Sequence, residues 1–284
     1  MKMKLIMNLK LRIILVSVII VSCTPKQKTW VALGDSITYL NEHTDETDNR
    51  ITKGYMTLVS EELPQISYIN KGYNGWTAVR VAKEIESLDL VSADVYTIFL
   101  GTNDWWHGLP IGTINNYKNN SGNDTFFGAY RTIIDKLRSL NKDAHIILMT
   151  PMQRGDFVYI NTMTNNAYGS YRDKGGQALE QFANAIVAIA QSENFDVVDL
   201  FHNSGMTLDN MVKYKRLKDP LTGEYKNFTY PDYVDVPFNP ETDEYPYPSE
   251  AIDMTYDGLH PSDEGYQVIA RMLIPLMNKP AKSD

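Results

Sequence analysis

Short apolar runs alternate with longer amphipathic segments along most of this chain. The apolar runs have the length and composition of buried strands, and they are Trp30–Leu33, Ser67–Asn70, Val95–Leu100, His145–Met149 and Asp196–Val198. The segments between and after them have helical spacing, and they are Gly54–Leu63, Thr77–Leu88, Phe126–Leu140, Gly176–Ser192 and Ser262–Met277. This alternation predicts an α/β fold with a central parallel sheet of about five strands and helices on both faces.

The alternation stops between Leu200 and Asp257, where no segment has a convincing strand pattern. This stretch is rich in proline, tyrosine and acidic residues. A loop of such length within a compact domain usually has a function or is disordered. The tyrosines favour packing over flexibility. We therefore expect one domain over residues 24–284 that carries an ordered excursion at about 201–256.

The first 23 residues have the pattern of a targeting segment. A basic start is followed by the apolar run Ile13–Val21, which is too short to span a bilayer about 30 Å thick. The run ends at Cys23, the only cysteine in the chain. Ile20-Val21-Ser22-Cys23 resembles the cleavage box of bacterial lipoproteins, whose cysteine carries the lipid. The resemblance implies an exported protein anchored to a membrane, in the periplasm or at the cell surface. An ordinary signal peptide or a buried thiol is the alternative.

The charge of the chain excludes one class of partner. Without the leader it has 23 basic and 35 acidic residues, a net charge of −12. An acidic surface repels nucleic acid and anionic membranes, so neither is expected to bind it directly. With a single cysteine no disulfide forms within the chain, and a hydrophobic core has to provide the stability.

Four short polar motifs come after predicted strands or just before the last predicted helix. They are Gly34-Asp35-Ser36, Asn70-Lys71-Gly72-Tyr73-Asn74-Gly75, Gly101-Thr102-Asn103-Asp104 and Asp257-Gly258-Leu259-His260. Each motif alone is typical of an ordinary turn. Ligands of parallel sheets bind at the carboxyl ends of the strands, so the four together indicate one functional site.

The residue types in these motifs fit acyl transfer. Ser36 is the candidate nucleophile, because a serine between a buried strand and a helix exposes its hydroxyl near the positive end of that helix. His260 is the candidate base, and Asp257 would orient its ring. The N–H groups of Ser36 and Gly75 and the side-chain amide of Asn103 are the candidate oxyanion donors. We expect glycine at position 75 because a close backbone approach leaves no room for a Cβ.

These motifs resemble those of the SGNH, or GDSL, hydrolases, a family of esterases and lipases with a flavodoxin-like three-layer α/β/α fold. The resemblance covers essentially the whole chain after the leader, except the excursion. It implies a nucleophile at Ser36, an oxyanion hole with Gly75 and Asn103, and a catalytic pair at Asp257 and His260. Thr38 replaces the second glycine of the nucleophile elbow of α/β-hydrolases, which argues against that family.

Aromatic residues adjoin the predicted oxyanion hole. Trp76, Trp105, Trp106 and His107 are candidate substrate contacts, because aromatic faces stack on sugar rings or pack on acyl chains. Wedging loops onto the sheet is nearly as good an explanation of the tryptophans.

The remaining polar residues of the motifs have simpler explanations. Asp35 and Asp104 are expected to brace turns or cap helices, and His145 to have a structural role. The histidines lack the spacing of metal ligands, so no metal or cofactor is expected.

The expected substrate is a short acyl ester, such as acetyl, on a carbohydrate. The excursion offers no strongly apolar face for a lipid-binding lid, since Met206–Val212 is its only apolar candidate and is short. A lipase, lysophospholipase or thioesterase of the same family remains open, as does acyl transfer to an acceptor other than water. A glycan-binding lipoprotein without activity is the alternative of another class. It has no physical need for Ser36, Asn103, Asp257 and His260 together, so the enzyme is favoured.

Overall fold

The computed structural model describes residues 27–279. The predicted leader and Cys23 lie outside the described residues. Between residues 27 and 279, none of the helices has the length and apolar character needed to cross a membrane.

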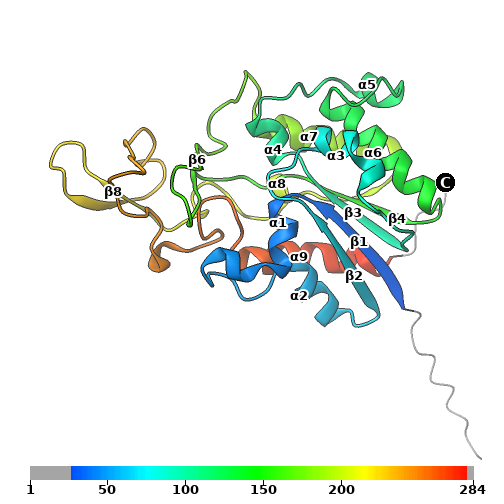
Figure 1. Cartoon of the computed structure of the whole chain (residues 1–284), viewed down its shortest axis with the longest axis horizontal. Helices are drawn as coiled ribbons and strands as arrows, with labels where there is room; N and C mark the ends of the chain where they lie inside the picture. Colours follow the sequence, from blue (N-terminus) through cyan, green and yellow to red (C-terminus); the bar gives the residue numbers. More distant parts are fainter. Residues whose placement is uncertain (1–26, 280–284) are drawn as a thin grey trace, which may run out of the picture.

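A five-stranded parallel sheet forms the centre of the fold (Figure 1). Its strands are β1 (Lys28–Gly34), β2 (Ile66–Gly72), β3 (Val95–Phe99), β4 (His145–Met149) and β7 (Asp196–Val198). The strand order is β2-β1-β3-β4-β7, so β2 is added on one side of β1 and the later strands on the other. The order therefore switches between β1 and β3. In open α/β sheets such a switch point creates the crevice that binds ligands, at the carboxyl ends of the strands.

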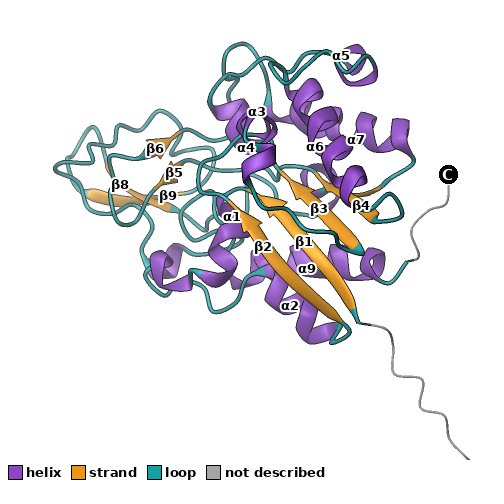
Figure 2. Ribbon diagram, turned by 45° about the vertical axis from the view of Figure 1, so that its right-hand side comes forward, coloured by secondary structure: helices purple, strands orange, loops and turns teal. Residues whose placement is uncertain are grey.

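Helices cover both faces of the sheet, as the sequence predicts (Figure 2). One layer contains α2 (Tyr55–Glu62) and α9 (Asp263–Met277), and the other contains α3 (Ala78–Lys83), α6 (Phe126–Leu140) and α7 (Leu179–Glu193). Successive residues of a strand point to opposite faces. Trp30 and Ala32 of β1 therefore pack with the first layer, and Val31 and Leu33 with the second. The expected three-layer α/β/α fold is confirmed.

Short helices follow the strands at the carboxyl edge of the sheet or lie in the connections. They are α1 (Ser36–Tyr39), α4 (Thr102–Trp106), α5 (Ile114–Lys118) and α8 (Leu200–Asn203). The helix expected over Thr77–Leu88 is shorter than predicted, because α3 ends at Lys83 and a 3₁₀ turn follows at Ile85–Ser87. Ile85 and Leu88 remain buried in the core, which explains why the apolar pattern continues beyond the helix.

Two small hairpins extend the fold beyond the carboxyl ends of the sheet strands (Figure 1). One pairs β5 (Phe157–Val158) with β6 (Asn166–Ala167), and the other pairs β8 (Lys215–Lys218) with β9 (Tyr225–Phe228). The expectation that residues 201–256 contain no strand is therefore wrong. β8 has the sequence Lys-Arg-Leu-Lys, and its buried positions are Lys215 and Leu217. A strand that buries a lysine lacks the apolar alternation by which strands are recognised.

Candidate active site

Ser36 lies at the sharp turn between β1 and α1. The turn requires glycine at position 34, because a Cβ there would lie 2.1 Å from Thr38 Oγ1 and 3.2 Å from the carbonyl oxygen of Phe99. The Asp35 carboxylate accepts a hydrogen bond from the N–H of Ile37 at 3.0 Å. The following helix α1 has only four residues, so its dipole contributes less at Ser36 than the sequence argument assumed.

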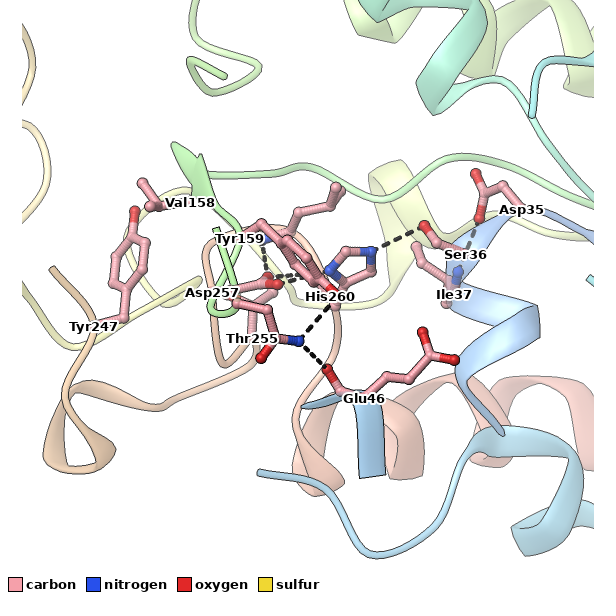
Figure 3. Close-up of polar contacts among 12 residues, drawn as sticks. Asp35, Ser36, Ile37, Glu46, Val158, Tyr159, Tyr247, Thr255, Asp257 and His260 are labelled. Carbon is pink, nitrogen blue, oxygen red and sulfur yellow. Dashed lines mark hydrogen bonds and ion pairs between the residues drawn. The ribbon is translucent and has the colours of Figure 1, made fainter. Parts of the chain in front are cut away.

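Ser36, His260 and Asp257 form a continuous hydrogen-bonded line (Figure 3). His260 Nε2 lies 2.9 Å from Ser36 Oγ, and His260 Nδ1 lies 2.7 Å from Asp257 Oδ2. A carboxylate accepts hydrogen bonds, so this arrangement favours the ring tautomer with its proton on Nδ1. His260 Nε2 is then free to accept the proton of the Ser36 hydroxyl. The structure thus brings together three residues that the sequence singled out, across 224 positions between Ser36 and His260.

The loop that carries His260 is held by the carboxylate of Asp257. Asp257 Oδ1 accepts hydrogen bonds from the N–H of Leu259 at 3.0 Å and of His260 at 2.7 Å. Gly258 has a φ of +88°, and a Cβ at this position would lie 1.8 Å from the carbonyl oxygen of Asp156. The tight turn therefore needs glycine, and it fixes the His260 ring against the carboxylate that orients it.

Aromatic side chains restrict the ring of His260 further. Tyr256 stacks on it at 5.9 Å between ring centroids, and Phe157 contacts it edge-on at 5.4 Å. His260 is only 6% exposed and Asp257 is fully buried. This packing leaves the ring few alternative orientations.

Gly75 and Asn103 line the same cavity as Ser36 and His260. The amide of Asn103 donates one hydrogen bond to the carbonyl oxygen of Trp76 at 3.0 Å, which leaves its second N–H available to a ligand. A Cβ at position 75 would have no protein atom within 4 Å, so crowding by the protein itself does not require glycine there. Gly75 instead has a φ of +71°, which other residues rarely adopt.

The two aspartates next to Ser36 and Asn103 are buried and hold the backbone. Asp104 accepts hydrogen bonds from the N–H groups of Ala78 at 2.8 Å and Val79 at 3.3 Å. Burial raises the pKa of Asp104 to about 7 and the pKa of Asp35 to about 6. Both groups therefore exchange protons near neutral pH.

The candidate substrate contacts fall into two groups. Trp106 and His107 line the cavity. Trp105 does not, because it is fully buried and its indole N–H donates to the carbonyl oxygen of Gln177 at 2.9 Å. The indole of Trp76 is also absent from the cavity wall; it stacks on Tyr73 at 4.4 Å. Trp105 and Trp76 therefore fit the alternative explanation, in which the tryptophans hold loops against the sheet.

The structure adds cavity residues that the sequence analysis missed. They include Arg154, Phe157 and Tyr159 after β4, and Tyr256 before Asp257. The only sequence signal for Arg154, Phe157 and Tyr159 as cavity residues was their position after the fourth strand, because such residues also lie at the carboxyl edge of the sheet.

The cavity has a volume of about 380 Å³, and its wall mixes aromatic with polar side chains. Within residues 27–279, no group of three or more His, Cys, Asp or Glu side chains is arranged to hold a metal ion. His145, far from the cavity in sequence and fold, pairs with Asp196 at 2.9 Å.

Comparisons with solved structures show which proteins this chain resembles in sequence and fold. The chain is 56% identical to a possible lipase from Chitinophaga pinensis, with a TM-score of 0.87 over 88% of this chain and 98% of that one. A mutant of an acetyl-xylooligosaccharide esterase from Geobacillus stearothermophilus has the same fold at 19% identity, with a TM-score of 0.51 over 91% and 98% of the two chains. No curated protein matches the sequence.

The match to a family of sequences extends over most of the chain. Residues 32–268 fit the GDSL-like lipase/acylhydrolase family, from the first buried strand to the last helix. The chain belongs to this family and is an ester hydrolase.

Proposed function

We propose that this protein is a serine esterase that removes short acyl groups, acetyl in particular, from carbohydrate. The observation that carries the proposal is the line of hydrogen bonds from Ser36 through His260 to Asp257 at the wall of a cavity. This arrangement supplies a nucleophile, a base and a group that orients the base.

The proposed reaction proceeds in two halves. His260 Nε2 takes the proton of Ser36 as Oγ attacks the ester carbonyl, and the resulting oxyanion is stabilised by the Ser36 and Gly75 N–H groups and the Asn103 amide. The tetrahedral intermediate collapses as His260 returns the proton to the leaving alcohol, which gives an acyl-enzyme. Water then attacks the acyl-enzyme, again with His260 as base, and releases the acid.

The cavity wall supports a polar carrier. Glu46, Asn74 and Asn165 offer hydrogen-bonding groups, and Trp106 and Tyr159 offer aromatic faces. Such a mixture suits a sugar ring, which has both hydroxyl groups and an apolar face. A lipase is the second candidate, because the Chitinophaga pinensis relative is described as a possible lipase.

The anchor at Cys23 is a separate proposal, which rests on the Ile20-Val21-Ser22-Cys23 pattern. The protein would be exported and held at a bacterial membrane by lipid on that cysteine.

Replacement of the proposed nucleophile and oxyanion donor tests the mechanism. Ser36→Ala should reduce kcat by about 10⁴–10⁶-fold, and Asn103→Ala by about 10²–10³-fold, because these groups act in the transition state. Release of nitrophenol from p-nitrophenyl acetate measures both. Asn115→Ala, an exposed position of α5, is the matched control and should retain full activity. Equal rates for the Ser36→Ala and unmodified proteins would refute the mechanism.

The pH dependence tests the role of His260. The rate should rise with pH and then reach a plateau, because only the neutral imidazole accepts the proton of Ser36. Burial raises the pKa of Asp35 to about 6, so its carboxyl is a second group that ionises within the pH interval tested. Because the assignment places the base at His260 and not at Asp35, the rise should persist in an Asp35→Asn variant, which removes the second ionising group. A rate that is independent of pH between about 5 and 9 would contradict the assignment.

Acyl chain length distinguishes the two candidate functions. In a series of nitrophenyl esters from acetate to octanoate, kcat/KM should be highest for acetate, and acetylated sugars should release acetate. A preference for octanoate would instead support a lipase.

The anchor is tested in cells with the full chain. The unmodified protein should partition into a detergent phase and carry the mass of attached acyl chains, whereas Cys23→Ser should remain in the aqueous phase. The same partitioning for both would refute lipidation at Cys23.

A further inference from the structure

Arg154 is a buried cation that forms no ion pair with any residue between 27 and 279. Its side chain is 1% exposed, and it lies at the wall of the cavity that contains Ser36 and His260. The guanidinium donates one hydrogen bond, to the carbonyl oxygen of Tyr168 at 3.3 Å. Its Nε atom has no partner within the part of the chain that the structure describes. Buried charges are normally paired, so this arrangement is costly unless a ligand completes it.

The acids near Arg154 are engaged elsewhere. Asp257 accepts hydrogen bonds from its own loop and from His260. Asp156 binds the ammonium group of Lys215 at 2.8 Å and the hydroxyl of Tyr171 at 2.6 Å. Among residues 27–279, no carboxylate forms an ion pair with Arg154. Burial lowers the pKa of Arg154 to about 10, although the nearby charges of Asp257 and Asp156 oppose this shift, and the group stays charged at neutral pH.

A second cation, Lys174, contacts a residue of this wall but does not itself line the cavity. Trp106, which lines the cavity, has Arg154 Cζ 5.4 Å and Lys174 Nζ 4.1 Å from its ring centroid. The side chain of Lys174 also has no hydrogen bond or ion pair within residues 27–279, and its contacts are with the rings of Trp106 and Tyr168. Two cations therefore lie close to Trp106 in a chain whose net charge is −8.

Glu46 is the carboxylate that lines the cavity without belonging to the proposed triad. It accepts a hydrogen bond from the hydroxyl of Tyr39 at 2.8 Å and lies 3.4 Å from Nδ1 of His43. These contacts hold it with α1 and the turn that follows, whereas Arg154 and Lys174 contact Trp106 of α4. A bound anion would thus meet Arg154 at a part of the wall built by other elements than those that hold Glu46.

We propose that Arg154 binds a carboxylate of the substrate, so that the preferred substrate is an acyl ester of an acidic sugar. The planar guanidinium of Arg154 has donors that match the two oxygens of a carboxylate. Trp106 beside it offers a face to the sugar ring. The proposal rests on the proposed esterase function and specifies the substrate class for the same cavity.

The test compares two substrates that differ only at carbon 6. These are an acetylated methyl glucuronoside, which carries a carboxylate, and the corresponding acetylated methyl glucoside, which carries a hydroxymethyl group. The unmodified protein should have a kcat/KM at least about tenfold higher for the acidic sugar, through a lower KM. Arg154→Gln should bring the ratio of the two kcat/KM values close to one. Arg154→Lys should retain part of the preference, because it keeps the charge but loses the planar fork.

The ratio separates recognition from general damage, because a loss of folding or of triad geometry affects both substrates alike. Lys142→Gln, which removes an exposed lysine on the surface, is the matched control and should leave the ratio unchanged. An equal or higher kcat/KM for the neutral sugar in the unmodified protein would overturn the proposal, as would an unchanged ratio in Arg154→Gln.

Binding gives a readout that does not depend on turnover. Calorimetric titration of the Ser36→Ala protein with the two sugars should show a Kd at least about tenfold lower for the glucuronoside. Adding Arg154→Gln to Ser36→Ala should abolish the difference. If the protein hydrolyses no ester but binds the glucuronoside in this way, the proposed function fails and the carboxylate site stands. If it hydrolyses esters and binds both sugars equally, the carboxylate site alone fails.

Discussion

The close approach of Gly258 to the backbone of Asp156 is the constraint on which the proposed catalytic geometry depends. A Cβ at position 258 would lie 1.8 Å from the Asp156 carbonyl oxygen, so the two chain segments meet without any side chain between them. A second link joins them, since the N–H of Val158 donates to the carbonyl oxygen of Asp257 at 3.2 Å. His260 reaches Ser36 because its loop is fixed against residues 154–158 in this way.

The excursion between β7 and α9 stabilises that same segment. The hydroxyl of Tyr247 donates to the carbonyl oxygen of Asp156, and the hydroxyl of Tyr245 donates to that of Val158 at 3.0 Å. Lys215, which is 4% exposed, forms a buried ion pair with the side chain of Asp156. Loss of one partner of such a pair leaves the other charge uncompensated, so the excursion helps to hold residues 154–158, against which the loop that carries His260 is fixed.

The fold, and the residues that meet at the proposed catalytic site, could be predicted from sequence because they depend on local signals. Strands buried on both faces give continuous apolar runs, as in β3 and β4, and tight turns at their ends require residues such as Gly34. The excursion could not be predicted in this way. Its strand β8 buries Lys215 by pairing it with Asp156. An ion pair between residues 59 positions apart produces no periodic pattern of apolar residues in the sequence. Arg154 escaped notice for the same reason, since its burial becomes evident only when Trp105, Trp106 and Tyr168 surround it.

Asp104, a residue with a structural role, helps to position its neighbour Asn103, a proposed oxyanion donor. Its carboxylate accepts the N–H of Ala78, and the neighbouring Asn103 donates to the carbonyl oxygen of Trp76. These two hydrogen bonds join the turn after β3 to the segment that begins at Gly75. Gly75 follows β2 and Asn103 follows β3. Asn103 and Asp104, adjacent residues of one motif, thus set these two proposed oxyanion donors relative to each other. Preorganised donors stabilise a developing charge without reorganising, so the fixed distance between Gly75 and Asn103 matters more than the flexibility of either loop. An aspartate beside the asparagine is therefore needed for geometry even though it does not contact the substrate in the proposed reaction.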